Sequence, residues 1–137
     1  MKVVLDTNIL VSGLLHSAGN PGQVLALALS GAVQVCQDAP ILDEYREVLA
    51  RPRFKLNPER VKEVLTKFES DGTSVIAGAE KLGLPDADDE PFLAVALAAS
   101  ADYLVTGNMR HYPAAQRRGC RVVTPAEFMG IWKRVSD

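Results

Sequence analysis

The feature that most constrains this fold is the alternation of short apolar runs with longer helical segments. Runs 2–5 and 103–106 consist mostly of β-forming residues without polar alternation, which is typical of strands covered on both faces. Segments with helical spacing of apolar residues, such as 41–49, separate these runs along the chain. We therefore predict a three-layer α/β domain with a central parallel sheet flanked by helices.

Proline, glycine and capping residues place the remaining boundaries. Asn20-Pro21 and Thr124-Pro125 begin helices, whereas Gly31 and Gly72 end them. The expected strands are 2–5, 32–36, 73–77, 103–106 and 121–123. The expected helices are 9–15, 20–30, 38–49, 57–71, 92–101 and 125–132, and an acidic loop is expected at 83–89.

Length and composition favour one globular domain spanning residues 1–137. Of the 137 residues, 47% are hydrophobic and 23% charged, which argues against a disordered or fibrous chain. The net charge of −2 gives no sign of a general attraction to nucleic acid or anionic membranes. We find no signal peptide and no apolar stretch of membrane-spanning length, so we expect a cytoplasmic protein. The lone cysteines Cys36 and Cys120 are predicted to be small buried thiols.

Acidic and amide side chains follow the predicted strands. Asp6 comes directly after the first strand and Asn108 follows the strand at 103–106. Three aspartates crowd the loop before the helix at 92–101, namely Asp86, Asp88 and Asp89. Because ligands bind outside the carboxyl ends of strands in parallel α/β sheets, these residues are candidates for a site. Each also has a plain structural interpretation as a turn or helix-capping residue.

Glu44 lies at the border of the packed face of its predicted helix. On a helical wheel it falls about 40° from Val48, whereas Asp43 and Glu47 point further toward solvent. A carboxylate in that position needs a cation or hydrogen-bond donors to offset its desolvation. A solvated edge position and an ion pair with an arginine are the alternatives.

Several carboxylates on one rim would repel one another unless a divalent cation lies among them. Since the set offers oxygen ligands and includes no cluster of His or Cys, it indicates Mg²⁺ or Mn²⁺ rather than zinc. Carboxylates around a hydrated cation are what metal-assisted hydrolysis of phosphate esters requires. This reasoning predicts phosphodiester or phosphate chemistry and leaves the substrate open.

Three segments of the chain resemble the motifs of PIN-domain nucleases. The first is Val4-Leu5-Asp6-Thr7-Asn8, and the others are Asp86-Ala87-Asp88-Asp89-Glu90-Pro91-Phe92 and Asp102-Tyr103-Leu104-Val105-Thr106-Gly107-Asn108. Their order is similar to that of PIN proteins that serve as toxin components of prokaryotic toxin–antitoxin systems. The resemblance implies a single PIN-like, Rossmann-like domain over residues 1–137.

The resemblance also implies roles for individual residues. Asp6, Glu44 and Asp89 match the three acidic positions that hold the metal and support catalysis. The fourth acidic position falls on Asn108, whose amide offers an oxygen ligand without charge. Neighbouring side chains predicted to support the site are Thr7, Asp86, Asp88 and Thr106.

The activity implied is that of a Mg²⁺- or Mn²⁺-dependent endoribonuclease that leaves a 3′-hydroxyl and a 5′-phosphate. Basic side chains are expected to contact RNA, with ordinary solvated surface as the alternative: Arg51, Arg53, Lys55, Arg110 and Arg117. We interpret His111 as a surface or phosphate-contacting residue. The family also implies a cognate antitoxin protein and a homodimer, for which the candidate residues are Leu14, Leu15, Leu25 and Leu29.

Two other metal-dependent α/β families fit poorly. A receiver domain requires an acidic pair after its first strand, where this chain has Asp6 followed by Thr7-Asn8. A haloacid-dehalogenase-type phosphatase requires an aspartate at the place that Asn8 occupies. The remaining alternative is a catalytically degenerate PIN fold that binds RNA or protein without cleavage, which the amide at Asn108 favours.

Overall fold

The computed structural model describes residues 1–78 and 80–136. Its centre is a sheet of five parallel strands in the order β3-β2-β1-β4-β5. The strands are β1 (Lys2–Leu5), β2 (Gln34–Gln37), β3 (Thr73–Ser74), β4 (Tyr103–Val105) and β5 (Val122–Val123). The prediction of a central parallel sheet is confirmed.

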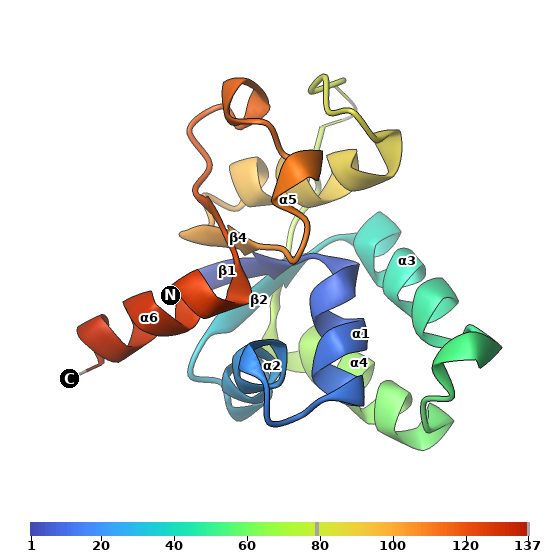
Figure 1. The fold of residues 1–137 in the computed structure, drawn as a ribbon. Helices are drawn as coiled ribbons and strands as arrows, with labels where there is room; N and C mark the ends of the chain where they lie inside the picture. The colour runs from blue at the N-terminus through green and yellow to red at the C-terminus, as the bar shows by residue number, and fades with distance from the viewer. Residues whose placement is uncertain (79, 137) are drawn as a thin grey trace.

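Helices lie on both sides of this sheet (Figure 1). They are α1 (Thr7–Leu15), α2 (Asn20–Ser30), α3 (Ala39–Leu49), α4 (Pro58–Asp71), α5 (Glu90–Ala98) and α6 (Pro125–Val135). Helix α5 lies on one side, whereas α1, α2 and α4 lie on the other, and α3 contacts both α1 and α5. The three-layer arrangement is therefore as predicted. Within the described parts of the chain, the helices are too short or too polar to cross a membrane.

The order of the strands creates a switch point between β1 and β4. From β1 the chain proceeds to β2 on one side, and it later returns to place β4 on the other side. The residue after β1 is tied to the end of β4, because Asp6 N donates a hydrogen bond to Val105 O at 3.0 Å. In open α/β sheets such a point is where side chains from separate loops meet, so it is the place to look for a site.

Several predicted boundaries are wrong by a few residues. Strand β3 ends at Ser74 rather than at 77, since this edge strand has one neighbour and its last link to β2 is from Val75 N to Gln37 O. Strand β2 begins at Gln34 rather than at 32, because residues 32 and 33 belong to the turn that follows Gly31, whose φ is 82°. Cys36 is buried as predicted, but Cys120 is only partly buried.

Two helices also begin or end differently from the prediction. Helix α5 spans Glu90–Ala98 rather than 92–101, because Pro91 is tolerated in the first turn and Ser100 adopts a φ of 50°. Helix α1 begins at Thr7, with Asp6 as its N-cap. Short 3₁₀ helices that the sequence analysis did not anticipate are η1 (Pro52–Phe54), η2 (Ala87–Asp89), η3 (Met109–His111) and η4 (Ala114–Gln116).

An aromatic cluster fixes α3 against the sheet. The buried ring of Tyr45 packs against Phe68 of α4 and Phe92 of α5, with ring centroids 6.3 and 6.1 Å apart. The Tyr45 hydroxyl donates a hydrogen bond to the backbone oxygen of Leu5, the last residue of β1. This contact holds the helix that carries Glu44 beside the strand that ends at Asp6.

The Tyr45 hydroxyl provides a test of this arrangement. We expect Tyr45→Phe to lower the free energy of unfolding by about 1 to 2 kcal/mol, because it removes the donor to a buried carbonyl. Tyr103→Phe, at a partly buried ring packed edge-on against Phe128, should change it by less than about 0.5 kcal/mol. Urea unfolding of both variants measures the difference, and equal losses would contradict the anchoring role of Tyr45.

Candidate metal centre at the carboxyl ends of the strands

An acidic cleft opens at the carboxyl edge of the sheet. It has a volume of about 340 Å³ and lies between α1, α3, η1, η2 and η3. Its charged lining consists of Asp6, Glu44, Arg51, Asp86, Asp88, Asp89 and His111. The structure thus brings together all five carboxylates that the sequence analysis selected, although they come from three separate parts of the chain.

Asp6 lies at the base of the cleft, where it is 4% exposed. Its Oδ1 accepts a hydrogen bond from Thr7 N at 2.8 Å. Its Oδ2 accepts from Thr106 Oγ1 at 2.8 Å and from the Tyr112 hydroxyl at 3.1 Å. Donors on three segments therefore fix the orientation of the carboxylate.

Glu44 reaches the same cleft from α3. Its side chain is half buried, as the helical wheel predicts, and its Oε2 accepts a hydrogen bond from Thr7 Oγ1. The partner of Glu44 is thus the Thr7 hydroxyl, and among the described residues no ion pair with an arginine is observed for this carboxylate. Thr7 thus contacts both predicted ligands, Asp6 through its backbone and Glu44 through its side chain.

Asp89 carries a buried oxygen to which no donor among the described residues makes a hydrogen bond of ordinary geometry. The residue ends η2 and is 8% exposed, and its Oδ2 lies 2.8 Å from His111 Nδ1. This contact is at ion-pair distance, and among the described residues no hydrogen bond of ordinary geometry reaches Oδ2. Single ligand atoms of Asp86, Asp89 and His111 lie within 4.8 Å of one another, a grouping compact enough to surround one cation.

The electrostatics of the cleft favour a bound cation. Burial raises the pKa of Asp6 and of Glu44 above their ordinary values, and the charge of Asp6 raises that of Glu44 further. Burial, with the nearby charge of Asp6, raises the pKa of Asp89 to about 6. Carboxylates that resist ionisation because they are desolvated and crowded are stabilised in their charged form by a divalent ion. The oxygen donors and the unpartnered Asp89 Oδ2 fit such an ion.

Thr106 and Asn108 stand behind the cleft rather than in its wall. The Thr106 hydroxyl, which holds Asp6, accepts a hydrogen bond from Asn108 N at 3.0 Å. The Asn108 side-chain nitrogen lies 2.9 Å from His111 Nε2. Asn8 Oδ1 accepts a hydrogen bond from Gly107 N at 2.8 Å, which links the start of α1 to the same segment. The predicted residues at 106 and 108 thus reach the site through Asp6 and His111.

The predicted basic residues lie in two segments with different surroundings. Arg51 lines the cleft and pairs with Glu47 at 2.8 Å, and the guanidinium of Arg53 stands 4.8 Å from the ring centroid of Phe54. Lys55 and Arg110 are exposed. Arg117 Nε donates to the backbone oxygen of Tyr112 at 2.8 Å, so this side chain also supports the fold.

The sequence analysis missed the contributions of His111 and Tyr112. Tyr112 is fully buried and donates to Asp6, and His111 is half buried against Asp89 rather than free on the surface. The sequence could have indicated these roles only through their place in the chain, since both residues closely follow the segment that carries Thr106 and Asn108.

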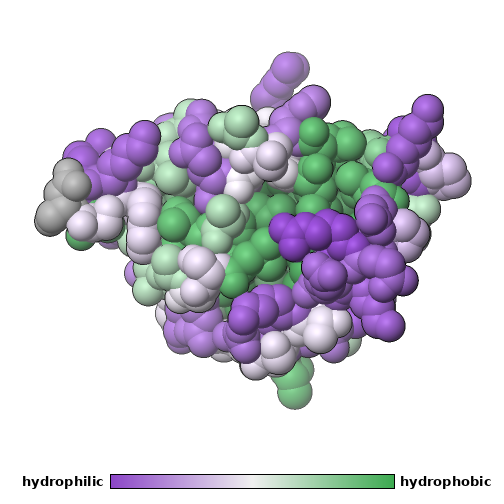
Figure 2. Space-filling model, turned by 90° about the horizontal axis from the view of Figure 1, so that it is seen from below, coloured by the Kyte–Doolittle hydropathy of each residue, from purple (hydrophilic) through white to green (hydrophobic). Residues whose placement is uncertain are grey.

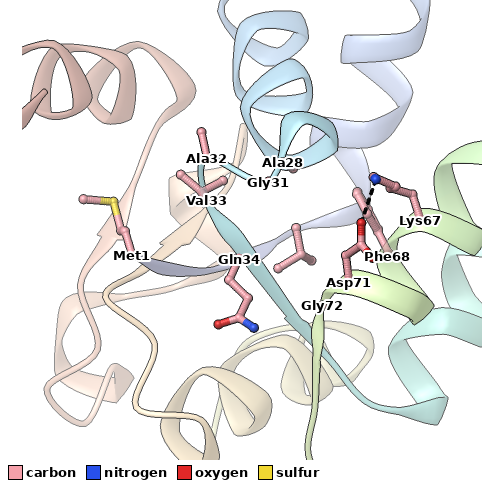
Figure 3. A pocket seen from close by; sticks show the side chains of 11 residues that line it. Met1, Ala28, Gly31, Ala32, Val33, Gln34, Lys67, Phe68, Asp71 and Gly72 are labelled. Atoms are coloured by element: carbon pink, nitrogen blue, oxygen red, sulfur yellow. Dashed lines mark ion pairs between the residues drawn. The ribbon is translucent and has the colours of Figure 1, made fainter.

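A second cavity lies at the opposite edge of the sheet and has different chemistry. Figure 3 shows it near Met1 and Gln34, at the amino ends of β1 and β2, with Lys67 pointing toward Asp71 of the same helix. Its volume is about 310 Å³, and its charged lining consists of this one ion pair, at 2.7 Å. Of these two cavities, the one at the carboxyl edge holds the cluster of carboxylates.

Comparisons with known proteins agree with this fold. A family model described as PIN domain matches residues 2–110. The chain is 27% identical to the uncharacterized protein MJ1680 of Methanocaldococcus jannaschii, over 94% of this chain and 90% of that protein. It also resembles a chain in the crystal structure of VapBC2 from Rickettsia felis bound to a DNA fragment from their promoter. That likeness has a TM-score of 0.57 at 19% identity, covers 90% of this chain and 98% of that chain, and concerns the fold.

The raised pKa of Asp89 predicts a pH-dependent stability in the metal-free protein. The folded state binds the proton more tightly than the unfolded state, so the free energy of unfolding should fall between about pH 4 and pH 7. With about 1.4 kcal/mol per pKa unit, this carboxylate accounts for at most about 3 kcal/mol of the fall. We expect Asp89→Asn to remove that part of the dependence.

Urea unfolding in EDTA across this pH range measures the effect. Asp43→Asn, at a largely exposed carboxylate on α3, is the matched control and should keep the dependence of the wild type. A parallel pH profile for wild type and Asp89→Asn would show that Asp89 is not destabilised by its surroundings.

Proposed function

The chain belongs to the PIN domain family, and we propose that it is an endoribonuclease that depends on Mg²⁺ or Mn²⁺. The observation that carries this proposal is the meeting of Asp6, Glu44 and Asp89 in one cleft at the switch point of the sheet. The unpartnered oxygen of Asp89 and the raised pKa values of all three carboxylates support it.

The three carboxylates would hold the cation, with Asp86 and Asp88 at the exposed rim as supporting groups. A bound Mg²⁺ or Mn²⁺ supplies a water of lowered pKa and offsets charge on the scissile phosphate. Thr106 and Tyr112 hold the Asp6 carboxylate in one orientation, and Thr7 does the same for Glu44. These contacts fix the ligands before any substrate arrives, so little reorganisation is needed when RNA binds.

Basic side chains on both sides of the cleft support RNA as the substrate. Arg51 lies in the cleft wall with Arg53 and Lys55 close behind it, and Arg110 is exposed in η3 beside His111. Arg117 follows Arg110 along the chain, but its Nε already donates a hydrogen bond to the backbone oxygen of Tyr112. Guanidinium and ammonium groups so placed hold phosphates in position without reading bases, which suits a single-stranded polyanion.

We also propose that the protein is the toxin of a toxin–antitoxin pair. The family membership and the likeness of fold to a chain of VapBC2 support this role. Figure 2 shows apolar residues gathered between hydrophilic ones on the face that lies away from α5. A groove of about 510 Å³ between α3 and α4 has an apolar floor that includes Leu49, Val61 and Leu65. An amphipathic segment of an antitoxin would suit such a surface.

The proposal includes a homodimer, although the four leucines suggested for it differ in exposure. Leu25 is buried in the core at 3% exposure, and Leu14 and Leu29 are partly buried. Leu15 is 43% exposed, so of the four leucines it is the one most available to a second copy.

Asp6→Asn tests the catalytic proposal. We expect cleavage of single-stranded RNA in Mg²⁺ or Mn²⁺ to fall by about a hundredfold or more, because loss of a ligand should exceed the roughly 10- to 100-fold typical of its outer partners. EDTA should abolish cleavage by the wild type. A time course on gels with end-labelled RNA measures both effects.

Asp102→Asn is the control for that experiment, because Asp102 is an exposed aspartate just before β4, at the far edge of the sheet. It should cleave RNA like the wild type. Binding of RNA that is unchanged by EDTA, with cleavage absent in every metal, would overturn the nuclease proposal and favour the non-catalytic binding module.

Arg51→Ala tests the proposed path of the RNA. In the Asp6→Asn background, which leaves the RNA intact, we expect weaker binding and a salt dependence whose slope is smaller by about 0.7. Arg60→Ala is the control, since Arg60 is exposed on α4 and pairs with Glu63 at 3.6 Å, outside the cleft. Fluorescence anisotropy at several salt concentrations measures the slopes, and an unchanged slope for Arg51→Ala would place the RNA elsewhere.

A further inference from the structure

The side chain of His111 lies in the acidic cleft beside the carboxylates of Asp86 and Asp89. Asn108, which follows β4, carries an uncharged amide. His111, three residues later, lies with Asp86 and Asp89 in the compact grouping of potential ligand atoms. Its Nδ1 lies 2.8 Å from the buried Asp89 Oδ2, which accepts no hydrogen bond of ordinary geometry from the described residues.

We propose that His111 supplies a nitrogen ligand to the cation held by Asp89, that Asn108 orients the imidazole, and that the site consequently prefers Mn²⁺ to Mg²⁺. This inference rests on the proposed metal-dependent function, and it names the ion and the ligand that this chain uses. The 2.8 Å between Asp89 Oδ2 and His111 Nδ1 is close to the roughly 3 Å between neighbouring ligand atoms around an octahedral ion with bonds of about 2.1 Å.

The contact between Asn108 and His111 determines which ring nitrogen is free. The Asn108 amide lies 2.9 Å from His111 Nε2, and a half-turn of the amide exchanges its nitrogen for its oxygen at that contact. With the oxygen there, Nε2 carries the proton and Nδ1 presents its lone pair to Asp89. Two acceptors at that separation repel each other unless a cation joins them. Metal-bound histidines show this arrangement, in which the second ring nitrogen donates to a fixed acceptor.

The nitrogen donor bears on the choice of ion. Protein sites for Mg²⁺ are built from carboxylates, phosphates and waters, whereas first-row transition ions also accept imidazole. An acidic residue at 108 would add a negative charge, which strengthens the binding of either ion. His111 adds a donor without charge, so its contribution is larger for Mn²⁺ than for Mg²⁺.

Metal binding in the absence of RNA tests the inference. We expect nitrogen couplings in pulsed electron paramagnetic resonance of Mn²⁺ bound to the wild type, and none after His111→Ala. The chain has two histidines, and His16→Ala, at an exposed loop position after α1, is the matched control that should retain the couplings. By calorimetry, His111→Ala should weaken Mn²⁺ binding about tenfold or more and Mg²⁺ binding much less.

Asn108→Leu separates orientation from coordination. It keeps the imidazole but removes the amide, so Mn²⁺ affinity should fall in the same direction as in His111→Ala, with circular dichroism confirming that both variants are folded. Bound Mn²⁺ without nitrogen coupling in the wild type, or equal losses of Mn²⁺ and Mg²⁺ affinity in His111→Ala, would overturn the role of His111. If the wild type still cleaves RNA in either case, the proposed nuclease function stands. If it binds no divalent ion and cleaves no RNA, both proposals fall.

Discussion

The fixed carboxylate of Asp6 is the constraint on which the rest of the site depends. Its two oxygens accept hydrogen bonds from Thr7, the first residue of α1, from Thr106, directly after β4, and from Tyr112, directly after η3. Thr106 and Tyr112 lie 100 and 106 residues from Asp6 in the chain, and they reach it because β1 and β4 are neighbours in the sheet. The fold places one acidic group at the switch point, and the other acidic groups are arranged around it.

This arrangement stabilises the fold and strains it at the same time. Asp6 caps α1, and Tyr45 ties α3 to β1, so the same contacts that hold the layers together also bring Glu44 to the cleft. The cost is the burial of carboxylates near one another, which raises the pKa of Asp6 and of Asp89. A divalent ion would offset that cost, and for this reason the metal-free site is expected to be less stable than the same fold with one carboxylate neutralised.

Much of the site could be predicted because its signals are local. The apolar run that ends at Asp6 indicates a buried strand, and the helical wheel correctly places Glu44 at the border of a packed face. The boundaries that failed depend on tertiary context: β3 is short because it lies at an edge, and α5 ends where Ser100 adopts a positive φ. The contacts of Tyr112 with Asp6 and of His111 with Asp89 have no periodic signature, since they depend on how η3 folds back over the sheet.

The position of Asn108 shows why a departure from a family pattern has to be interpreted in its surroundings. By sequence alone, an amide in place of a carboxylate indicates a weakened metal site. In the structure the amide contacts His111, and its backbone nitrogen contacts the threonine that holds Asp6. The lost charge is therefore linked to a residue that offers a different donor.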